Sequence, residues 1–103
     1  DFFTPHVTVH STGAIEHATH ALQCDFANSY IGGHVLSYGT AQEEIRFAVS
    51  PELIVSRLVC TQMTNMEAIV VKGTEQYSHY KGYGMKLEFV PSKSEEKRQQ
   101  SAV

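Results

Sequence analysis

The sequence is poor in the features that mark membrane, nucleic-acid-binding or secreted proteins. It contains no run of about 18 consecutive apolar residues, the length that a helix needs to cross a bilayer. Lysine and arginine number 8 against 11 aspartates and glutamates, and the net charge of -3 gives no basic surface for a nucleic acid. The opening residues, DFFTPHVTVH, lack the basic and apolar regions of a secretory signal peptide. We therefore expect an ordinary soluble globular protein.

Cysteine and histidine are present without the spacing of a structural framework. Cys24 and Cys60 each lie in an apolar run, which predicts two buried thiols rather than a disulfide, and an intracellular, reducing compartment. The 6 histidines form no convincing pattern with carboxylates or thiols. We therefore expect no metal site and no cofactor.

Hydrophobic patterning over the 103 residues predicts one small α/β domain. Alternating apolar residues indicate strands at 6–11, 21–27 and 85–90, and a continuous apolar run predicts a strand buried on both faces at 68–71. Apolar residues three and four positions apart predict a helix from residue 41. Ser50-Pro51-Glu52 predicts the start of a second helix, with Ser50 as its N-cap. The expected architecture is a mixed sheet flanked by helices over 1–90, incomplete in this chain, with a polar, disordered tail at 91–103.

A glycine-rich loop leads into two adjacent glutamates in the stretch IGGHVLSYGTAQEEIRF. Gly32, Gly33 and Gly39 permit positive φ or close approach to a ligand, and the following helix start attracts anions. The loop matches neither the P-loop nor the dinucleotide motif, so a tight turn alone would also explain it. Glu43 and Glu44 could merely offset the helix dipole. In a closed pocket, however, two nearby carboxyls cannot both ionise easily, and the protonated one can act as a general acid in acetal cleavage.

Four stretches resemble the poly(ADP-ribose) glycohydrolase family: VHSTGAIE, LQCDFANSYIGGHV, AQEEIRFAVSPELIVSRL and GTEQYSHYKGY. They follow the family's order, and the family's motif is a triple glycine followed by Gln-Glu-Glu. The resemblance implies a macrodomain-like fold and an enzyme that hydrolyses ribose–ribose glycosidic bonds in poly(ADP-ribose) and releases ADP-ribose. It implies poly(ADP-ribose) and ADP-ribosylated proteins as partners, without nucleic-acid or membrane binding. It also implies a location in the nucleus and/or the cytoplasm.

The resemblance further implies roles for the residues around the paired carboxylates. Glu44 matches the catalytic acid, which protonates the departing ribose 2′-oxygen and then, as a carboxylate, activates the attacking water. Glu43 and Asn28 match residues that hydrogen-bond the terminal ribose, although Asn28 would also serve as a turn former. Gly32 and Gly33 match the loop that passes close to the ligand.

Residues further along the chain match the rest of the family's ligand site. Ile15 and Glu16 match the pair that contacts the adenine, with a place in the core as the alternative for Ile15. Gln42 matches a contact beside the ribose and phosphates. Tyr83 matches an aromatic residue that closes over ADP-ribose, whereas Tyr80 fits a ligand contact and a core lid equally well.

His34 stands where the family has its third glycine. If that position requires positive φ, a histidine there costs of order 1 kcal/mol or more. Its ring would either fill space meant for the ligand, point outward, or attract the diphosphate when protonated. The family's diphosphate-binding loop and second stacking aromatic have no match after Val90. Three hypotheses therefore stand: a glycohydrolase, a weakened or truncated ADP-ribose-binding module, and a fragment that neither folds stably nor binds.

Overall fold

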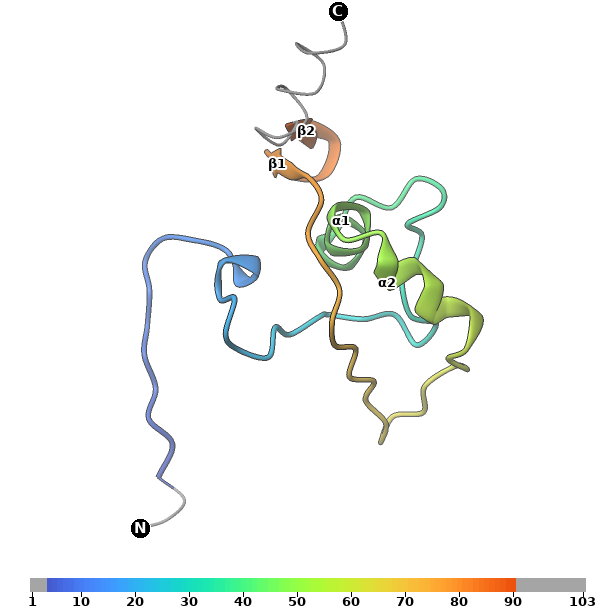
Figure 1. Ribbon diagram of the computed structural model, residues 1–103, viewed down its shortest axis with the longest axis horizontal. Helices are drawn as coiled ribbons and strands as arrows, with labels where there is room; N and C mark the ends of the chain where they lie inside the picture. The colour runs from blue at the N-terminus through green and yellow to red at the C-terminus, as the bar shows by residue number, and fades with distance from the viewer. Residues whose placement is uncertain (1–3, 91–103) are drawn as a thin grey trace, which may run out of the picture.

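The computed structural model describes residues 4–90, and short helices form its centre (Figure 1). Its elements, in chain order and with η marking 3-10 helices, are η1 (Ile15–His17), α1 (Gln42–Val49), α2 (Glu52–Val55), η2 (Ser56–Leu58), β1 (His79–Lys81), η3 (Gly84–Lys86) and β2 (Glu88–Val90). Residues 4–14, which precede η1, are exposed and run away from the helices as an extended arm (Figure 1). The tail expected at 91–103 lies outside the described residues.

The predicted first helix is confirmed as α1, and it is buried on two sides. Its buried residues are Glu43, Ile45, Phe47 and Val49. Residues four positions apart share a side of a helix, so this set forms two pairs that face different neighbours. Phe47 packs against Ile31 and Leu53 in the core, with Val35, Ile54, Cys60 and Ile69 partly buried around them. The other pair, Ile45 and Val49, lines a small cavity with Tyr80 of β1.

The predicted second helix is also confirmed, because α2 begins directly after Pro51. Pro51 has φ of -65°, the value that its ring imposes and that a helix requires. The proposed cap is wrong: Ser50 makes no side-chain cap, and its hydroxyl accepts a hydrogen bond from Arg46 Nη1 at 2.7 Å. Ser50 is fully buried, and its hydroxyl pairs with a side chain of the preceding helix α1.

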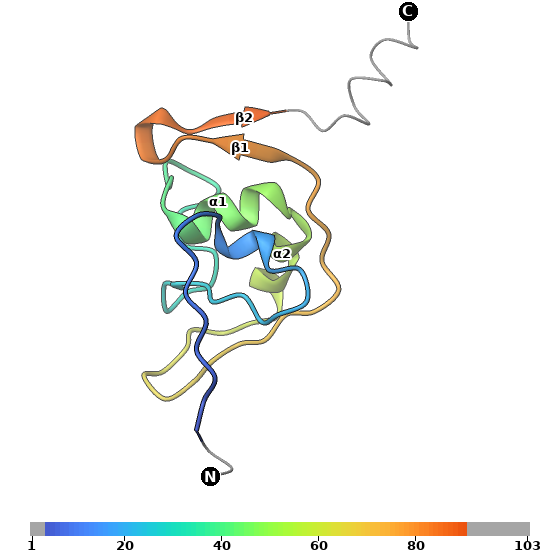
Figure 2. The same cartoon turned by 90° about the vertical axis from the view of Figure 1, so that its left-hand side faces the viewer.

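The strands β1 and β2 form an antiparallel hairpin that lies over α1 (Figure 2). Their register pairs His79 with Val90, Tyr80 with Phe89, and Lys81 with Glu88. The last pair also makes an exposed ion pair at 3.1 Å, an interaction that contributes little in water. The strand expected at 85–90 is confined to Glu88–Val90, and its partner His79–Lys81 lies where no strand was expected.

The other expected strands are wrong as elements of the described structure. Residues 6–11, 21–27 and 68–71 form neither helix nor strand, and none of them is paired in a sheet. Val9 is 87% exposed, and Ala68, Val70 and Val71 are exposed where burial on both faces was expected. Apolar alternation favours an extended chain, but a strand also needs a partner for its backbone N–H and C=O groups. Residues 4–90 therefore hold a two-stranded sheet and helices, as an incomplete α/β unit would.

Cys24 and Cys60 are free thiols, as expected, but neither is fully buried: Cys24 is exposed and Cys60 is partly buried. The Cys24 side chain lies on an unpaired extended segment, so nothing in residues 4–90 covers it. No helix in the described part of the chain has the length and apolar character to cross a bilayer. Within the same residues, no three histidine, cysteine, aspartate or glutamate side chains are grouped as a metal ion would need.

Candidate functional site

The glycine loop folds into a compact turn in front of α1. Gly32 and Gly33 have φ of 91° and 51°, conformations that side chains with a Cβ rarely adopt. Asn28 starts the turn, because its Oδ1 accepts a hydrogen bond from the Tyr30 amide at 3.0 Å. The Gly39 amide ends it by donating to the His34 carbonyl at 3.1 Å. The backbone amides along this turn are thereby presented to the first residues of α1.

Glu43 is the residue onto which this turn closes. Its side chain is only 4% exposed. Oε1 accepts a hydrogen bond from the Gly32 amide at 2.6 Å, and Oε2 accepts one from the Asn28 amide at 2.9 Å. Hydrogen bonds from N–H groups to a buried carboxylate are short and strong. Glu43 therefore fixes the turn to the helix and has little freedom of its own.

Glu44 occupies a different environment, although it is the next residue. It is partly exposed, and its Oε1 accepts one long hydrogen bond, from the His34 amide at 3.4 Å. A Cβ built on Gly33 would lie 2.9 Å from Glu44 Oε1, and one built on Gly39 would lie 2.6 Å from the same atom. Gly39 does not have positive φ, so close approach is its only requirement for glycine. The Glu44 carboxylate lies in a slot between two glycine backbones, with access to solvent.

His34 fits the turn without backbone strain. No residue other than glycine has positive φ in residues 4–90, so the cost considered for a histidine here does not arise. Its carbonyl accepts hydrogen bonds from the Ser37 amide, the Gly39 amide and the Ser37 hydroxyl, at 3.0, 3.1 and 3.2 Å. The side chain is exposed. His34 is thus held by its backbone beside Glu44, with its ring toward water.

Gln42 links α1 to the segment before the turn. Its Oε1 accepts a hydrogen bond from the Phe26 amide at 2.9 Å, and its Nε2 donates to the Cys24 carbonyl at 2.9 Å. The amide group thereby pairs with the backbone as a neighbouring strand would. This arrangement holds the segment between these two bonds, and Asp25 with it, against the start of the helix.

Asp25 is a carboxylate that the sequence reasoning missed. The pKa of Asp25 is raised to about 6, first by burial and then by the charge of Glu43 and a hydrogen bond with that residue. Glu44 adds to the rise, and Arg46 opposes it. Asp25 Oδ1 is buried without a hydrogen-bond partner in the described part of the chain. The available signal was an acidic residue within an alternating apolar segment, three positions before Asn28.

Two of the remaining predicted residues, Glu16 and Tyr83, lie with Gln42 beside another part of α1. Glu16, Gln42 and Tyr83 line a cavity of about 30 Å³, together with Ile45, Arg46, Val49 and Tyr80. A hydrogen bond with Glu16, followed by burial, raises the pKa of Tyr80 to about 12. Ile15 does not line this cavity and is 36% exposed in η1. Three segments far apart in the sequence therefore meet here, in a space large enough for about one water molecule.

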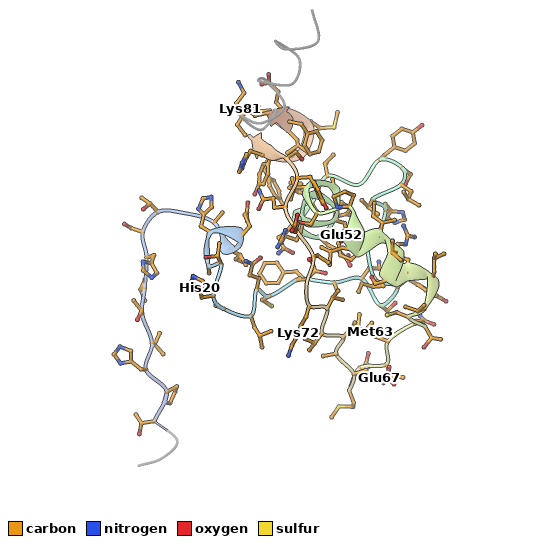
Figure 3. All side chains as sticks on the ribbon, viewed as in Figure 1. His20, Glu52, Met63, Glu67, Lys72 and Lys81 are labelled. Carbon is orange, nitrogen blue, oxygen red and sulfur yellow. The ribbon has the colours of Figure 1, made fainter. Side chains whose placement is uncertain are left out.

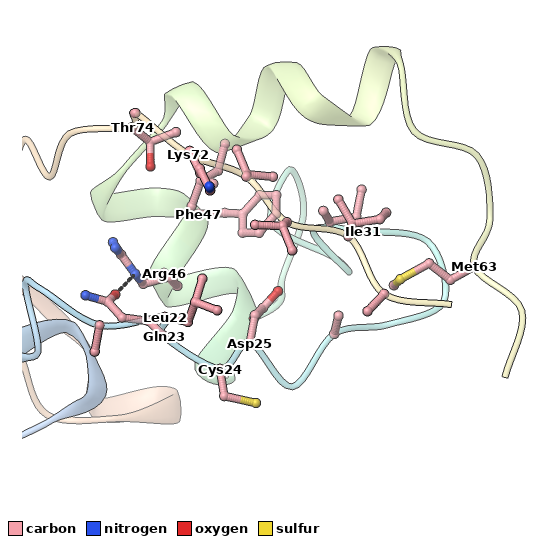
Figure 4. A pocket seen from close by; sticks show the side chains of 18 of the residues that line it. Leu22, Gln23, Cys24, Asp25, Ile31, Arg46, Phe47, Met63, Lys72 and Thr74 are labelled. Carbon is pink, nitrogen blue, oxygen red and sulfur yellow. Dashed lines mark hydrogen bonds between the residues drawn. The ribbon is translucent and has the colours of Figure 1, made fainter. Parts of the chain in front are cut away.

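A much larger cavity, of about 810 Å³, lies elsewhere and contains none of the predicted site residues (Figure 4). Ile31, Phe47 and Leu53 form one wall, and the unpaired segments around Leu22 and Ile69 form the others. Met63, Glu67 and Lys72 lie on the part of the chain that loops away from the helices (Figure 3). One wall of this cavity is made of apolar core residues, and its lining contains neither Glu43 nor Glu44, so it is not the candidate site. Asp25 lines this cavity, and its carboxyl interacts with that of Glu43.

The chain is similar to known proteins over most of its length. A family model described as poly(ADP-ribose) glycohydrolase with a macro domain fold matches residues 3–103. The chain is 45% identical over 84 residues to the probable poly(ADP-ribose) glycohydrolase 2 of Arabidopsis thaliana, and 49% identical over 82 residues to poly(ADP-ribose) glycohydrolase 1 of the same plant. It is 40% identical over 95 residues to poly(ADP-ribose) glycohydrolase 1 of Caenorhabditis elegans.

The alignments cover most of this chain and a small part of each relative. They include 81%, 79% and 92% of the chain, in the order given. The same alignments span 16%, 15% and 12% of the relatives' own lengths. The segment that matches carries the glycine turn and both glutamates.

Proposed function

Because the chain belongs to the poly(ADP-ribose) glycohydrolase family, a family of glycosidases with a macro domain fold, we propose that it supplies the catalytic carboxylates that hydrolyse poly(ADP-ribose). The bond cleaved is the ribose–ribose glycosidic bond, and the product is ADP-ribose. The substrate is a polymer attached to proteins, so ADP-ribosylated proteins are the proposed partners. The proposed places of action are the nucleus and the cytoplasm.

The observation that carries this proposal is the unequal environment of the two glutamates. Glu43 is buried and accepts two backbone hydrogen bonds, whereas Glu44 is partly exposed and accepts one long one. A group that transfers protons must reach both the substrate and water. Glu44 meets that condition, and Glu43 meets the condition of a rigid support. We therefore assign proton transfer to Glu44 and positioning to Glu43.

In the proposed reaction, the protonated carboxyl of Glu44 donates its proton to the 2′-oxygen of the departing ribose. The glycosidic C–O bond breaks, and positive charge develops at the ribose carbon, as in other glycosidases. Glu44, now a carboxylate, takes a proton from a water molecule while the water oxygen bonds to that carbon. The products are a free hydroxyl on each ribose, and Glu44 ends protonated as it began. No cofactor takes part.

The other residues hold the substrate in this scheme. Asn28 and Glu43 hydrogen-bond the terminal ribose, and the backbone of Gly32 and Gly33 lies along the sugar and diphosphate. His34, exposed next to Glu44, faces the same approach.

Beyond the turn, four residues complete the proposed contacts. Ile15 and Glu16 contact the adenine, Gln42 lies beside the ribose and phosphates, and Tyr83 covers the nucleotide. Tyr83 is 59% exposed, so it can close over a ligand from solution. Glu16, Gln42 and Tyr83 come from segments far apart in the sequence and lie around one small cavity, which supports their contact with a single ligand.

The test uses the purified 103-residue chain in two assays. Its thermal midpoint with millimolar ADP-ribose should rise, because a ligand that binds only the folded state stabilises it. Release of ADP-ribose from labelled polymer should be lost in Glu44→Gln, while the thermal shift remains. Activity retained in Glu44→Gln would contradict the role of Glu44. A thermal shift without polymer cleavage in the unsubstituted chain would instead identify an ADP-ribose-binding module.

A further inference from the structure

Two side chains, those of Arg57 and Phe47, lie close to Gly32. A Cβ built on this glycine would lie 3.0 Å from Cδ of Arg57 and 3.1 Å from Cε2 of Phe47. These distances are shorter than ordinary contacts between a Cβ and its neighbours, so Arg57 and Phe47 leave no room for a side chain at Gly32. The amide of the same glycine donates a hydrogen bond to Glu43 Oε1 at 2.6 Å.

The two side chains come from different helices. Phe47 belongs to α1 and is 2% exposed in the core. Arg57 belongs to η2 and is partly buried. Arg57 Nη1 is buried without a hydrogen-bond partner among residues 4–90. A buried donor without a partner costs free energy, and the Arg57 atom that lies beside Gly32 is Cδ of the aliphatic stem.

We propose that Arg57 is a positioning residue for the carboxylate pair and acts through Gly32. Its stem and the Phe47 ring fill the space that a side chain at Gly32 would take, and they keep the Gly32 amide within hydrogen-bond distance of Glu43. Glu43 is thereby aligned for the role assigned to it above, so the inference rests in part on the proposed function. Arg57 itself has no contact with the reacting groups in this scheme.

The experiment compares variants that separate the stem of Arg57 from its charge. Arg57→Met keeps an unbranched stem and removes the guanidinium, and Arg57→Ala removes both. Leu58→Ala is the matched control, because Leu58 lies in the same turn of 3-10 helix and is 85% exposed. The readout is the proton chemical shift of the Gly32 amide and its hydrogen-exchange rate in the ligand-free chain, measured by NMR.

Arg57→Ala should move the Gly32 amide resonance upfield and speed its exchange by about tenfold, which corresponds to about 1.4 kcal/mol. Arg57→Met and Leu58→Ala should leave both quantities unchanged. A Gly32 amide that is unaltered in Arg57→Ala overturns the proposal, and so does an Arg57→Met variant that behaves like Arg57→Ala. If Arg57→Ala does not fold, Arg57→Val, which ends at Cγ, takes its place with the same expectations.

A second readout connects the contact to ligand binding and keeps the two proposals separate. Titration with ADP-ribose should give a Kd that is about tenfold weaker in Arg57→Ala than in Arg57→Met. If neither the parent chain nor any variant binds ADP-ribose, the proposed function is wrong for this chain. The Gly32 amide still decides the positioning role in that case, because its measurement needs no ligand.

Discussion

Replacing Glu43 by glutamine should destabilise the folded chain much more than the same change at Glu44. The Glu43 carboxylate is 4% exposed and accepts hydrogen bonds at 2.6 and 2.9 Å from two backbone amides. Glutamine keeps one acceptor oxygen, and its NH₂ group is a donor. One of the two backbone amides therefore faces another donor and loses its acceptor. One buried hydrogen bond to a charged group is lost, which costs about 1.5–3 kcal/mol.

A smaller effect opposes this loss. The charge of Glu43 helps to raise the pKa of Asp25, so the neutral glutamine relieves repulsion between the two side chains. Burial is the larger cause of that rise, and the relief therefore recovers only part of the cost. The net loss should be about 2 kcal/mol, or about 10 °C in thermal midpoint for a chain of this size.

Urea denaturation at pH 7, followed by far-UV circular dichroism, measures the difference directly. Glu44→Gln is the control, since Glu44 is partly exposed and accepts a single hydrogen bond at 3.4 Å. That control should lose less than about 1 kcal/mol. Equal losses in the two variants would refute the conclusion that the turn is fixed to α1 through Glu43. An NMR titration of Asp25 in Glu43→Gln should also give a lower pKa for that residue.

Three further predictions concern residues around the same turn. The pKa of Asp25 is raised from 3.8 to about 6, so protonation favours the folded state, and the free energy of unfolding should fall as the pH rises from about 4 to about 6. Solvent screening reduces this contribution to about 1–2 kcal/mol, and Asp25→Asn should remove it in urea titrations across that range; an unchanged slope would exclude Asp25 as its source. Gly39→Ala should cost about 1–3 kcal/mol by the same measurement, because the new Cβ would lie 2.6 Å from Glu44 Oε1, and a neutral effect would mean that the slot around Glu44 is wider than described. His34→Gly should lower the free energy of unfolding by about 0.5–1 kcal/mol, and with it the thermal midpoint. His34 does not have positive φ, so glycine relieves no strain and only raises the conformational entropy of the unfolded chain. A stabilised variant would indicate strain at this position.

Much of the helical layer and of the glutamate turn could be predicted from the sequence. The start of α2 after Pro51 depends on a fixed φ, and α1 depends on apolar residues that recur at helical spacing. Gly32 and Gly33 were expected to allow positive φ, and both adopt it. These features arise from contacts within a few residues of one another, so a short stretch of sequence contains the information.

The strands and the electrostatics could not be predicted in the same way. Residues 21–27 and 68–71 have the apolar pattern of strands, but pairing needs a partner that the pattern does not name. The sequence placed two equivalent glutamates side by side, and the packing of the turn buried Glu43 and left Glu44 accessible. The family resemblance implied different roles for them, and the burial gives a physical reason for that difference.

The sequence by itself thus determined the family, α1 and the start of α2, and the residues that form the turn before α1. Only the tertiary structure decided which carboxylate is held, that Asp25 joins the pair with a raised pKa, and that Gly39 and Arg57 pack close to the site. The reason is physical: local conformation follows from each residue and its neighbours in the chain, whereas burial and charge coupling depend on segments that meet only after folding.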